Sequence, residues 1–426
     1  MHVIVVTIGS RGDIFPFIGL GRALQASGCS VHFVTAGNYR AAVTEAGLRF
    51  VELCDAATYE AVRDLFEHTP ARRDEMTPAQ WDAARAFFSM APEGAYRLVE
   101  ANHVPGETIL AASAMYLNGA GRLAREKLGI PYVAVRHNAG EMRGLTPRLP
   151  RAGRAAEMWF RNLTLRRLWP MRENEARYQR LRAELGLPPH RNLVEAHWYS
   201  EQLNVALFPA WFAPWFRGQL PNTIFTNFPL YETADAEGLP GELDSFLRRG
   251  SPPLVFTYAS WLTNVERYFD ASRDACRALG LRAVFLSEHA PAFDEDGDPE
   301  TITLPYAPLK LLLPRARALV HHGGIGTVAR ALAEGTPQLI VPGVGDQPFN
   351  GKTVQTLGAG LTVSRDQYVR DPLGALKSLL ESRTIGETCR KLSQRVPQEP
   401  DFREVVRRFE GLLEDGRRTA GARRGG

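Results

Sequence analysis

The feature that most constrains the fold is a glycine-rich turn that follows a short apolar run, His321-His322-Gly323-Gly324-Ile325-Gly326-Thr327. It predicts the end of a buried strand, a tight turn and a helix from about Ile325 to Glu334. The start of a helix presents unpaired N–H groups and a partial positive charge, so it suits a phosphate. The glycines let the backbone approach a ligand, and the two histidines add hydrogen-bond donors. The turn therefore predicts an α/β domain with an anion site.

A second polar patch, residues 343–350, follows the next apolar run and contains Asp346 and Gln347. A phosphate cradle followed by a carboxylate and an amide favours a phosphate that carries a polyhydroxylated group, such as a nucleotide sugar. Glycine-rich turns alone are common in α/β proteins, so the acid–amide pair strengthens the interpretation. Five residues separate Gly345 from Gly351, one more than a P-loop has, which disfavours an NTPase.

Alternating apolar runs and helical patterns predict two similar α/β domains, because 426 residues exceed one ordinary core. We expect an N-terminal domain over 1–226, a linker over 227–242 and a second domain over 243–400. A C-terminal helix over 401–416 is expected to pack back on the N-terminal domain, and a tail over 417–426 to be disordered. Each domain should hold a parallel, doubly wound sheet, with ligands beyond the carboxyl ends of its strands.

Particular strands and helices follow from the same patterns. The first helix is expected from about Ile14 to Ala26, and the last from about Phe402 to Leu413. The expected strands are Val3–Thr7, Val31–Thr35, Phe50–Leu53, Thr108–Ala112, Tyr132–Val135, Asn204–Phe208, Leu254–Tyr258, Ala283–Ser287, Ala318–His321, Gln338–Val341 and Leu361–Val363.

Composition narrows the function classes. A net charge of +4 fits an anionic small molecule and does not demand nucleic acid. The four cysteines are scattered without a CxxC pair, which argues against structural zinc and favours the cytoplasm. We expect no signal peptide and no membrane span, and peripheral membrane contact stays open. No metal-ligand cluster is evident, so no metal is expected.

The segment from His321 to Asn350 resembles the donor-binding signature of family 1 inverting glycosyltransferases of the GT-B fold. The opening Thr7–Pro16 is similar to the acceptor-domain loop of bacterial natural-product members. Four further runs look closest to the rhamnosyltransferase chain of rhamnolipid synthesis: Phe15–Leu20, Leu207–Pro214, Pro253–Thr257 and Tyr306–Leu309. The resemblance implies an acceptor-binding and a donor-binding domain, both Rossmann-like, that face each other across a cleft.

The activity implied is inverting, metal-independent transfer of a hexose to a hydroxyl of an apolar acceptor. The donor would be a dTDP- or UDP-sugar. The candidate hexoses include 6-deoxyhexoses such as rhamnose. The acceptor would be a hydroxy-fatty acid lipid or an aromatic or polyketide natural product. The nucleotide sugar is a co-substrate, and no further cofactor is expected.

The resemblance also implies roles for residues of the donor domain. His322, beside His321, contacts the diphosphate and stabilises the leaving group. Tyr306 stacks on the base, Ser260 lies near the phosphates, and the remaining donor residues are Gly324, Gly326, Thr327, Asp346 and Gln347.

Two residues depart from the pattern of uridine-using plant relatives. Arg330 replaces a glutamate that holds the ribose hydroxyls, and a guanidinium cannot accept hydrogen bonds. Leu309 replaces a glutamine beside the base. Both changes favour a dTDP-sugar over a UDP-sugar.

The resemblance implies that Asp13, in the first strand-to-helix turn, is the base that activates the acceptor. A carboxylate can serve if deprotonation lags behind C–O cleavage. Asp13 also fits a plain N-cap of the helix expected from Ile14, and His137 is the alternative base. Expected acceptor contacts are Ile14, Phe15, Phe88 and His137, within a domain whose segment 81–170 is rich in aromatics.

Two other classes stay open from the residues alone. A Rossmann-type NAD-dependent oxidoreductase is opposed by the absence of GxGxxG near the N-terminus. A non-catalytic nucleotide-sugar-binding protein is opposed by the presence of Asp13, His322 and the Asp346–Gln347 pair. The oligomeric state has no signal in the sequence.

Overall fold

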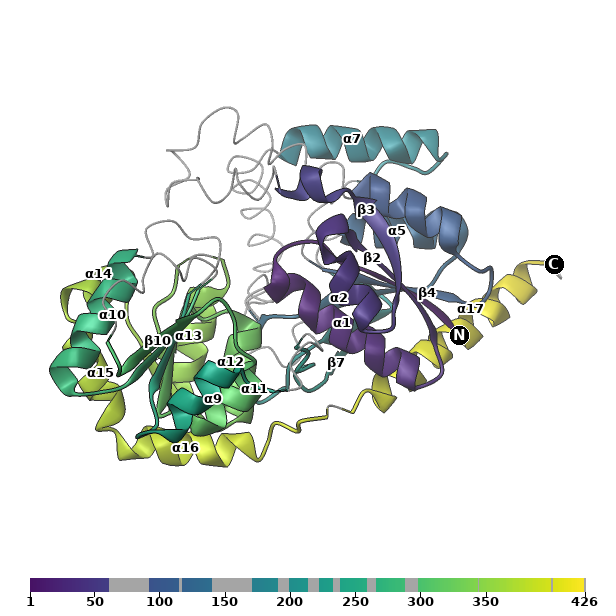
Figure 1. The fold of residues 1–426 in the computed structure, drawn as a ribbon. Coiled ribbons are helices and arrows are strands. Elements are labelled where there is room, and N and C mark those ends of the chain that lie inside the picture. The colour runs from purple at the N-terminus through teal and green to yellow at the C-terminus, as the bar shows by residue number, and fades with distance from the viewer. Residues whose placement is uncertain are drawn as a thin grey trace, which may run out of the picture. The chain divides into compact units, whose positions relative to one another are not determined.

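The computed structural model divides into two compact units (Figure 1). The N-terminal unit comprises Met1–Tyr231 and Asp401–Gly426, and the C-terminal unit comprises Glu232–Pro400. The chain therefore crosses between them twice, and the first crossing lies inside the expected linker. The structure describes residues 1–60, 92–114, 117–139, 171–190, 199–213, 222–232, 238–258, 266–287, 298–343, 345–399 and 401–424.

The N-terminal unit contains a seven-stranded parallel sheet of order β3-β2-β1-β4-β5-β6-β7. Its central strands are continuous apolar runs because both faces of the sheet are covered. The short strand β7 was not expected from the sequence. The strands are β1 (His2–Val6), β2 (Ser30–Ala36), β3 (Arg49–Cys54), β4 (Thr108–Ser113), β5 (Tyr132–Arg136), β6 (Leu203–Ala206) and β7 (Thr223–Phe225).

Its first helix begins at Arg11, three residues before the expected start at Ile14, because Ser10 is the N-cap. The interpretation of Asp13 as N-cap is therefore wrong, and Asp13 is the third residue of the helix. The helices of this unit include α1 (Arg11–Ala26), η1 (Gly37–Tyr39), α2 (Arg40–Glu45), α5 (Asn118–Leu128), α7 (Met171–Glu184) and α17 (Arg403–Arg424).

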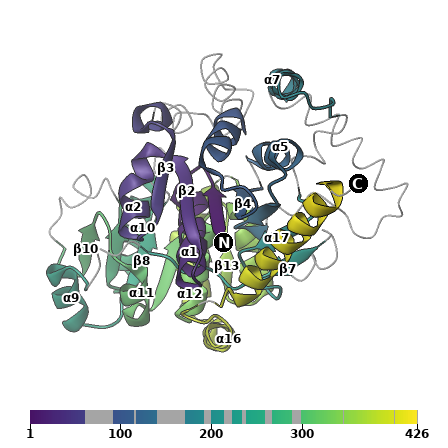
Figure 2. The same cartoon turned by 90° about the vertical axis from the view of Figure 1, so that its right-hand side faces the viewer.

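The C-terminal helix α17 belongs to the N-terminal unit and is yellow in Figures 1 and 2. Val405, Phe409 and Leu413 on one side of it are buried in the core of that unit. The helix continues to Arg424, so the tail that was expected to be disordered from residue 417 is helical over most of its length. Alanine and arginine are good helix formers, and the Arg417 Nε–H donates to the Gly106 carbonyl at 3.0 Å.

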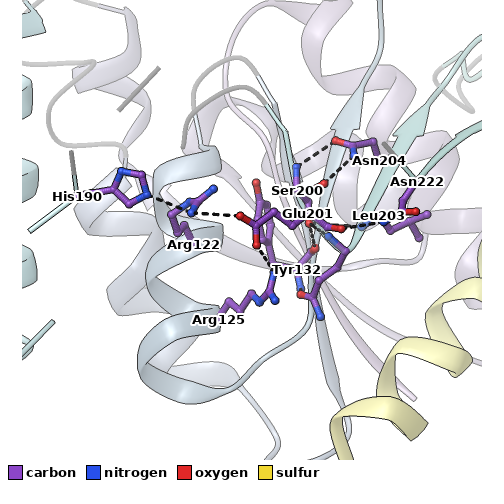
Figure 3. Close-up of polar contacts among 10 residues, drawn as sticks. Arg122, Arg125, Tyr132, His190, Ser200, Glu201, Leu203, Asn204 and Asn222 are labelled. Atoms are coloured by element: carbon purple, nitrogen blue, oxygen red, sulfur yellow. Dashed lines mark hydrogen bonds and ion pairs between the residues drawn. The ribbon is translucent and has the colours of Figure 1, made fainter. Parts of the chain in front are cut away.

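A hydrogen-bonded network fixes the starts of β5 and β6 (Figure 3). The Ser200 Oγ–H donates to the Tyr132 carbonyl at 2.7 Å, and the Asn204 amide donates to the Ser200 carbonyl at 2.7 Å. Glu201 lies 3.5 Å from Arg125 and 4.0 Å from Arg122, both on α5. Because β5 ends just before His137, the network holds in place the strand that presents that histidine.

The C-terminal unit contains a six-stranded parallel sheet of order β10-β9-β8-β11-β12-β13. Only β10, an edge strand, was not expected from the sequence. The prediction of two Rossmann-like domains is confirmed. The strands are β8 (Leu254–Thr257), β9 (Ala283–Leu286), β10 (Thr301–Leu304), β11 (Ala318–His321), β12 (Gln338–Ile340) and β13 (Gly360–Thr362).

The helices of this unit form two groups: α10, α14 and α15 pack on one another, and α12 packs on both α11 and α16. The helix expected from Ile325 is present as α12. The described helices are α9 (Gly241–Arg248), α10 (Glu266–Leu279), α11 (Leu309–Leu312), η6 (Leu313–Arg315), α12 (Ile325–Ala333), α13 (Gln347–Thr356), α14 (Arg365–Arg370), α15 (Pro372–Leu380) and α16 (Arg383–Ser393).

Candidate functional site

Asp13 lies in the first turn of α1, beyond the carboxyl end of β1. Its Oδ2 accepts hydrogen bonds from the Ser10 backbone N–H at 2.7 Å and from the Ser10 hydroxyl at 2.8 Å. Gly9 makes room for this carboxylate: its φ is +136°, and a Cβ there would lie 2.5 Å from the same oxygen. The turn therefore needs glycine at position 9, which leaves space for the Asp13 carboxylate.

His137 contacts the other oxygen of the carboxylate. Its Nε2 lies 3.1 Å from Asp13 Oδ1. The side chain of His137 is 3% exposed and that of Asp13 is 20% exposed, so Asp13 is the member that solvent reaches. The two residues that the sequence offered as alternative bases are therefore partners.

The charge state of Asp13 follows from these contacts. Burial raises the pKa of its carboxyl, but hydrogen bonding to His137, the His137 charge and the Ser10 donors outweigh burial. The pKa therefore lies below its ordinary value, and Asp13 is a carboxylate at neutral pH. A hydrogen-bonded carboxylate next to an imidazole can accept a proton from an alcohol and share its charge with the ring.

The other residues expected to contact the acceptor lie in different surroundings. Ile14 is completely buried in the core of the N-terminal unit. Phe15 is half-buried and packs edge-to-face on Tyr231, with ring centroids 5.4 Å apart. Phe88 lies outside the described residues, as do residues 81–91, 115–116 and 140–170 of the aromatic segment 81–170.

The turn at the start of α12 is open. Its N-cap is Gly324, which has no side chain to accept from the helix N–H groups, while Gly326 is exposed and Thr327 is partly exposed. Gly323 has φ +93°, and a Cβ there would lie 2.8 Å from the Ile340 side chain. Only glycine fits this conformation and this space. The first turn of α12 is therefore available to an anion.

The two adjacent histidines differ. His321 is completely buried: its Nδ1 accepts from the Gly323 N–H at 3.2 Å, and its Nε2 lies 3.1 Å from the Gln338 side-chain oxygen. Both nitrogens of His321 are thus used inside the unit, where they shape the turn. His322 is partly exposed, and its Nε2 lies near Gly324, where a Cβ would approach it to 2.7 Å.

Both rings are neutral at pH 7. Burial, with a contribution from His322, lowers the pKa of His321 to about 3. Burial alone lowers the pKa of His322 to about 4. A neutral imidazole can still donate one N–H to a phosphate oxygen, so any positive potential in this turn comes mainly from the helix end.

The acid–amide patch is tied to the glycine turn by Asn350, to which the sequence analysis assigned no role. The Asn350 Nδ2 donates to the Asp346 carboxylate at 2.7 Å and to the Gly323 carbonyl at 3.0 Å. Gln347 is 4% exposed, and its Oε1 accepts from the Gly343 N–H at 2.9 Å. Asp346 is more accessible than Gln347. The position of Asn350 within the patch was the only available signal for its role.

Tyr306 follows β10 and is 45% exposed, more than any other large hydrophobic side chain among the described residues. An exposed ring of this kind suits stacking on a base. Arg330 is 4% exposed, and its Nε–H donates to Glu232 at 2.7 Å. Ser260 lies outside the described residues.

Within the described part of the chain, no three His, Cys, Asp or Glu side chains lie close enough together to bind a metal ion. No described helix has both the length and the apolar character needed to cross a bilayer.

In comparisons with known proteins, each unit matches a family domain of its own. Residues 3–142 match the glycosyltransferase family 28 N-terminal domain, and residues 294–412 match the erythromycin biosynthesis protein CIII-like C-terminal domain. The chain is 28% identical over 389 residues to the glycosyltransferase GtfC of Amycolatopsis orientalis, a match that covers 88% of this chain and 89% of GtfC. It is 27% identical over 420 residues to the O-mycaminosyltylonolide 6-deoxyallosyltransferase of Streptomyces fradiae, with 94% of each chain covered.

Solved structures show the same fold. The glycotransferase of kitacinnamycin superposes with a TM-score of 0.73 at 18% identity, over 97% of this chain and 99% of the other. The glycosyltransferase VinC in complex with dTDP superposes with a TM-score of 0.64 at 20% identity, over 97% of this chain and 100% of the other.

Proposed function

Since the chain belongs to the GT-B glycosyltransferases of the bacterial natural-product type, we propose that it transfers a hexose from a dTDP-sugar to a hydroxyl of an apolar small molecule, with inversion. The observation that carries the donor assignment is the open start of α12. Its N-cap is a glycine, and a partly exposed histidine lies beside it. A diphosphate supplies the acceptors that these N–H groups lack.

The donor is held by residues of the C-terminal unit. The diphosphate accepts from the first turn of α12 and from His322, and Tyr306 stacks on the base. Asp346 accepts from sugar hydroxyls, in an orientation set by Asn350. His321, with both nitrogens used internally, is a positioning residue for the turn.

Three observations favour dTDP over UDP as the nucleotide of the donor. Arg330 is buried against Glu232 and presents no acceptor to a ribose hydroxyl. Leu309 offers the base no hydrogen bond. Among the related structures, VinC and SsfS6 are described in complex with dTDP or thymidine diphosphate. A 6-deoxyhexose such as rhamnose, and a polyketide or lipid acceptor, are the finer parts of this proposal.

In the transfer step, Asp13 accepts the proton of the acceptor hydroxyl as that oxygen bonds to the anomeric carbon. The bond from that carbon to the diphosphate oxygen breaks, and the electron pair leaves with the diphosphate. Attack from the face opposite the leaving group inverts the centre. His137 stabilises the Asp13 carboxylate before transfer, while the start of α12 stabilises the charge on the departing diphosphate.

The first test is ligand-dependent thermal stability of the full chain with dTDP, UDP and NAD⁺. A ligand that binds only the native state raises the melting temperature, and we expect the largest rise with dTDP. His322→Ala should then weaken dTDP binding by about tenfold in calorimetry, the value of one charge-assisted hydrogen bond. Equal shifts with all three ligands, or an unchanged affinity in the variant, would reject this donor site.

A further inference from the structure

Arg330 has an arrangement that donor recognition does not explain. It is 4% exposed and lies near the C-terminal end of α12. Its Nε–H donates to Glu232 at 2.7 Å, and its Nη1 donates to Glu334 at 3.2 Å and to Gln398 at 3.1 Å. The Gln398 amide also donates to Glu334 at 3.2 Å. One buried guanidinium therefore holds three side chains from different parts of the chain.

Two of these partners flank the points where the chain passes between the units. Glu232 is the first residue of the C-terminal unit, and Gln398 lies two residues before its end at Pro400. Glu232 also accepts weakly from the Lys310 N–H, at 3.4 Å. Both crossings are thus attached to the C-terminal unit through the same side chain.

The residue on the other side of the first crossing is attached to the N-terminal unit. The Tyr231 hydroxyl donates to the Ala42 carbonyl at 3.2 Å, and its ring packs on Phe15 at 5.4 Å. The first crossing is therefore anchored on either side of a single peptide bond, between Tyr231 and Glu232. Loss of the Arg330 contact would release one of the two anchors.

We propose that Arg330 is a positioning residue that fastens both chain crossings to α12. The same helix begins at the turn that we assign to the diphosphate, nine residues in all from Ile325 to Ala333. The donor turn and both chain crossings are thus attached to one helix. A planar guanidinium with several fixed donors suits this task, whereas lysine offers a single point charge. The consequence for catalysis rests on the transfer proposed above, but the structural claim does not.

The structural claim is tested by the distribution of distances between two spin labels in the full chain. Labels are placed at the exposed residues Ala26 of α1 and Lys352 of α13, after replacement of the half-buried Cys54 by Ser. We expect a broader distribution in Arg330→Met than in the wild type and an intermediate one in Arg330→Lys.

Arg282→Met is the matched control. Arg282 is also a buried arginine of the C-terminal unit, 6% exposed, and it donates to the Ser251 and Phe246 carbonyls at 3.0 and 2.6 Å. Its polar side-chain contacts within the described residues are with Ser251, Phe246 and Glu300 and not with Glu232 or Gln398, so its loss should lower stability without broadening the distribution. Equal distributions in the Arg330→Met and Arg282→Met variants would overturn the proposal. If Arg330→Met does not fold, Glu232→Ala and Gln398→Ala each remove one of the contacts of Arg330 with the crossings, and unchanged distributions in both variants would also overturn the proposal.

The kinetic test separates tethering from binding. In Arg330→Met we expect a turnover number about tenfold lower, because small errors in the placement of reacting groups are costly. The affinity for dTDP should stay unchanged, since the start of α12 is intact. Lower dTDP affinity with normal turnover would contradict the positioning role. If the wild type binds no nucleoside diphosphate, the proposed function fails, and the label distances still decide the structural claim.

Discussion

The helices α1 and α12 begin at equivalent places in the two units, but the first turn of α1 carries a carboxylate and that of α12 does not. Each follows a central parallel strand, β1 or β11, and each has glycine as its second residue. The third residue is Asp13 in α1 and Thr327 in α12. In α1 that carboxylate accepts from the N-cap residue Ser10, so the helix start is occupied by an anion of the protein itself. In α12 the N-cap is Gly324, and the helix start is left for an anion from outside.

The histidines of the two units differ in the same sense. His137 contacts a carboxylate of its own unit, and so it supports a group that can accept a proton. Among the described residues His322 has no acidic partner, and burial lowers its pKa to about 4, so in the proposed donor site it acts as a neutral hydrogen-bond donor. Two units of the same architecture thus differ in the charge of their helix starts because of one position, the third residue of the first helical turn. In the transfer that we propose, the N-terminal unit supplies the base and the C-terminal unit binds the leaving group.

The largest effect is expected from Asp13→Asn, which makes the start of α1 neutral. Asparagine keeps the size of the side chain but cannot accept the acceptor's proton. Turnover should fall by about 10²- to 10⁴-fold, the usual contribution of a positioned general base. Sugar transfer measured at saturating donor, together with dTDP affinity by calorimetry, checks this. Affinity should be unchanged because the donor turn belongs to the other unit, and near-normal turnover would remove Asp13 as base.

The converse change is Thr327→Asp, which gives α12 the carboxylate that α1 has. The new charge would occupy the helix start and repel the diphosphate. We expect dTDP affinity to fall by about 10- to 100-fold, since like charges so close cost one to several kcal/mol. The folded protein should be no less stable, because an acid in the first helical turn is favourable.

Thr327→Asn is the neutral control for that experiment, with the same side-chain shape as aspartate. Calorimetric titration of both variants with dTDP separates charge from size. A similar loss of affinity in the two would mean that space, and not the open helix start, governs binding at this turn.

Much of this contrast could be predicted from the sequence because it depends on local patterns. Buried parallel strands are apolar runs, and a glycine pair before a periodic segment marks the start of a helix, so β1, β11 and α12 were all expected. The start of α1 was displaced by three residues because Ser10, and not Asp13, is the N-cap. The strands β7 and β10 were missed because they are three and four residues long and only half-buried over most of their length.

The pairing of Asp13 with His137 could not be predicted because it depends on strand order. The two residues follow β1 and β5, which are separated in the sheet by β4 alone. A sequence of apolar runs does not state that order. Similarly, nothing in two adjacent histidines indicates that His321 is used internally while His322 is partly exposed.

Acid should destabilise both units, because each has buried histidines whose pKa is lowered. Burial lowers the pKa of His2 to about 4, with the neighbouring His32 adding to it, and lowers that of His321 to about 3. In the unfolded chain each of these histidines binds a proton below its ordinary pKa near 6.5, whereas in the folded chain it stays neutral until the pH is much lower. Stability is therefore fully present above that pH and falls as the pH decreases towards 4.

His2→Asn tests the share of the N-terminal unit in this acid sensitivity. The asparagine amide can keep the 2.8 Å contact of the His2 Nδ1 with Thr108, but it does not titrate. Between pH 6 and 4.5, the slope of unfolding free energy against pH should fall by about 1.4 kcal/mol per pH unit, the value of one proton. Denaturant unfolding at several pH values measures this, and an unchanged slope would mean that His2 is not a source of the acid sensitivity.

The smallest effect is expected from Ser10→Ala, which removes one of the donors to Asp13 and leaves the backbone donor in place. Stability should fall by about 1 kcal/mol, the typical net value of one hydrogen bond. Because the Ser10 hydroxyl lowers the pKa of Asp13, its loss should raise that pKa, and the acid limb of the turnover profile should move to higher pH.

Ser364→Ala is the matched control, since Ser364 caps α14 of the other unit through a capping box with Gln367. It should lower stability similarly and leave the profile unchanged. If the profile moved in both variants, or in neither, the Ser10 hydroxyl would not specifically set the pKa of Asp13. The contrast between the two helix starts would then be weaker.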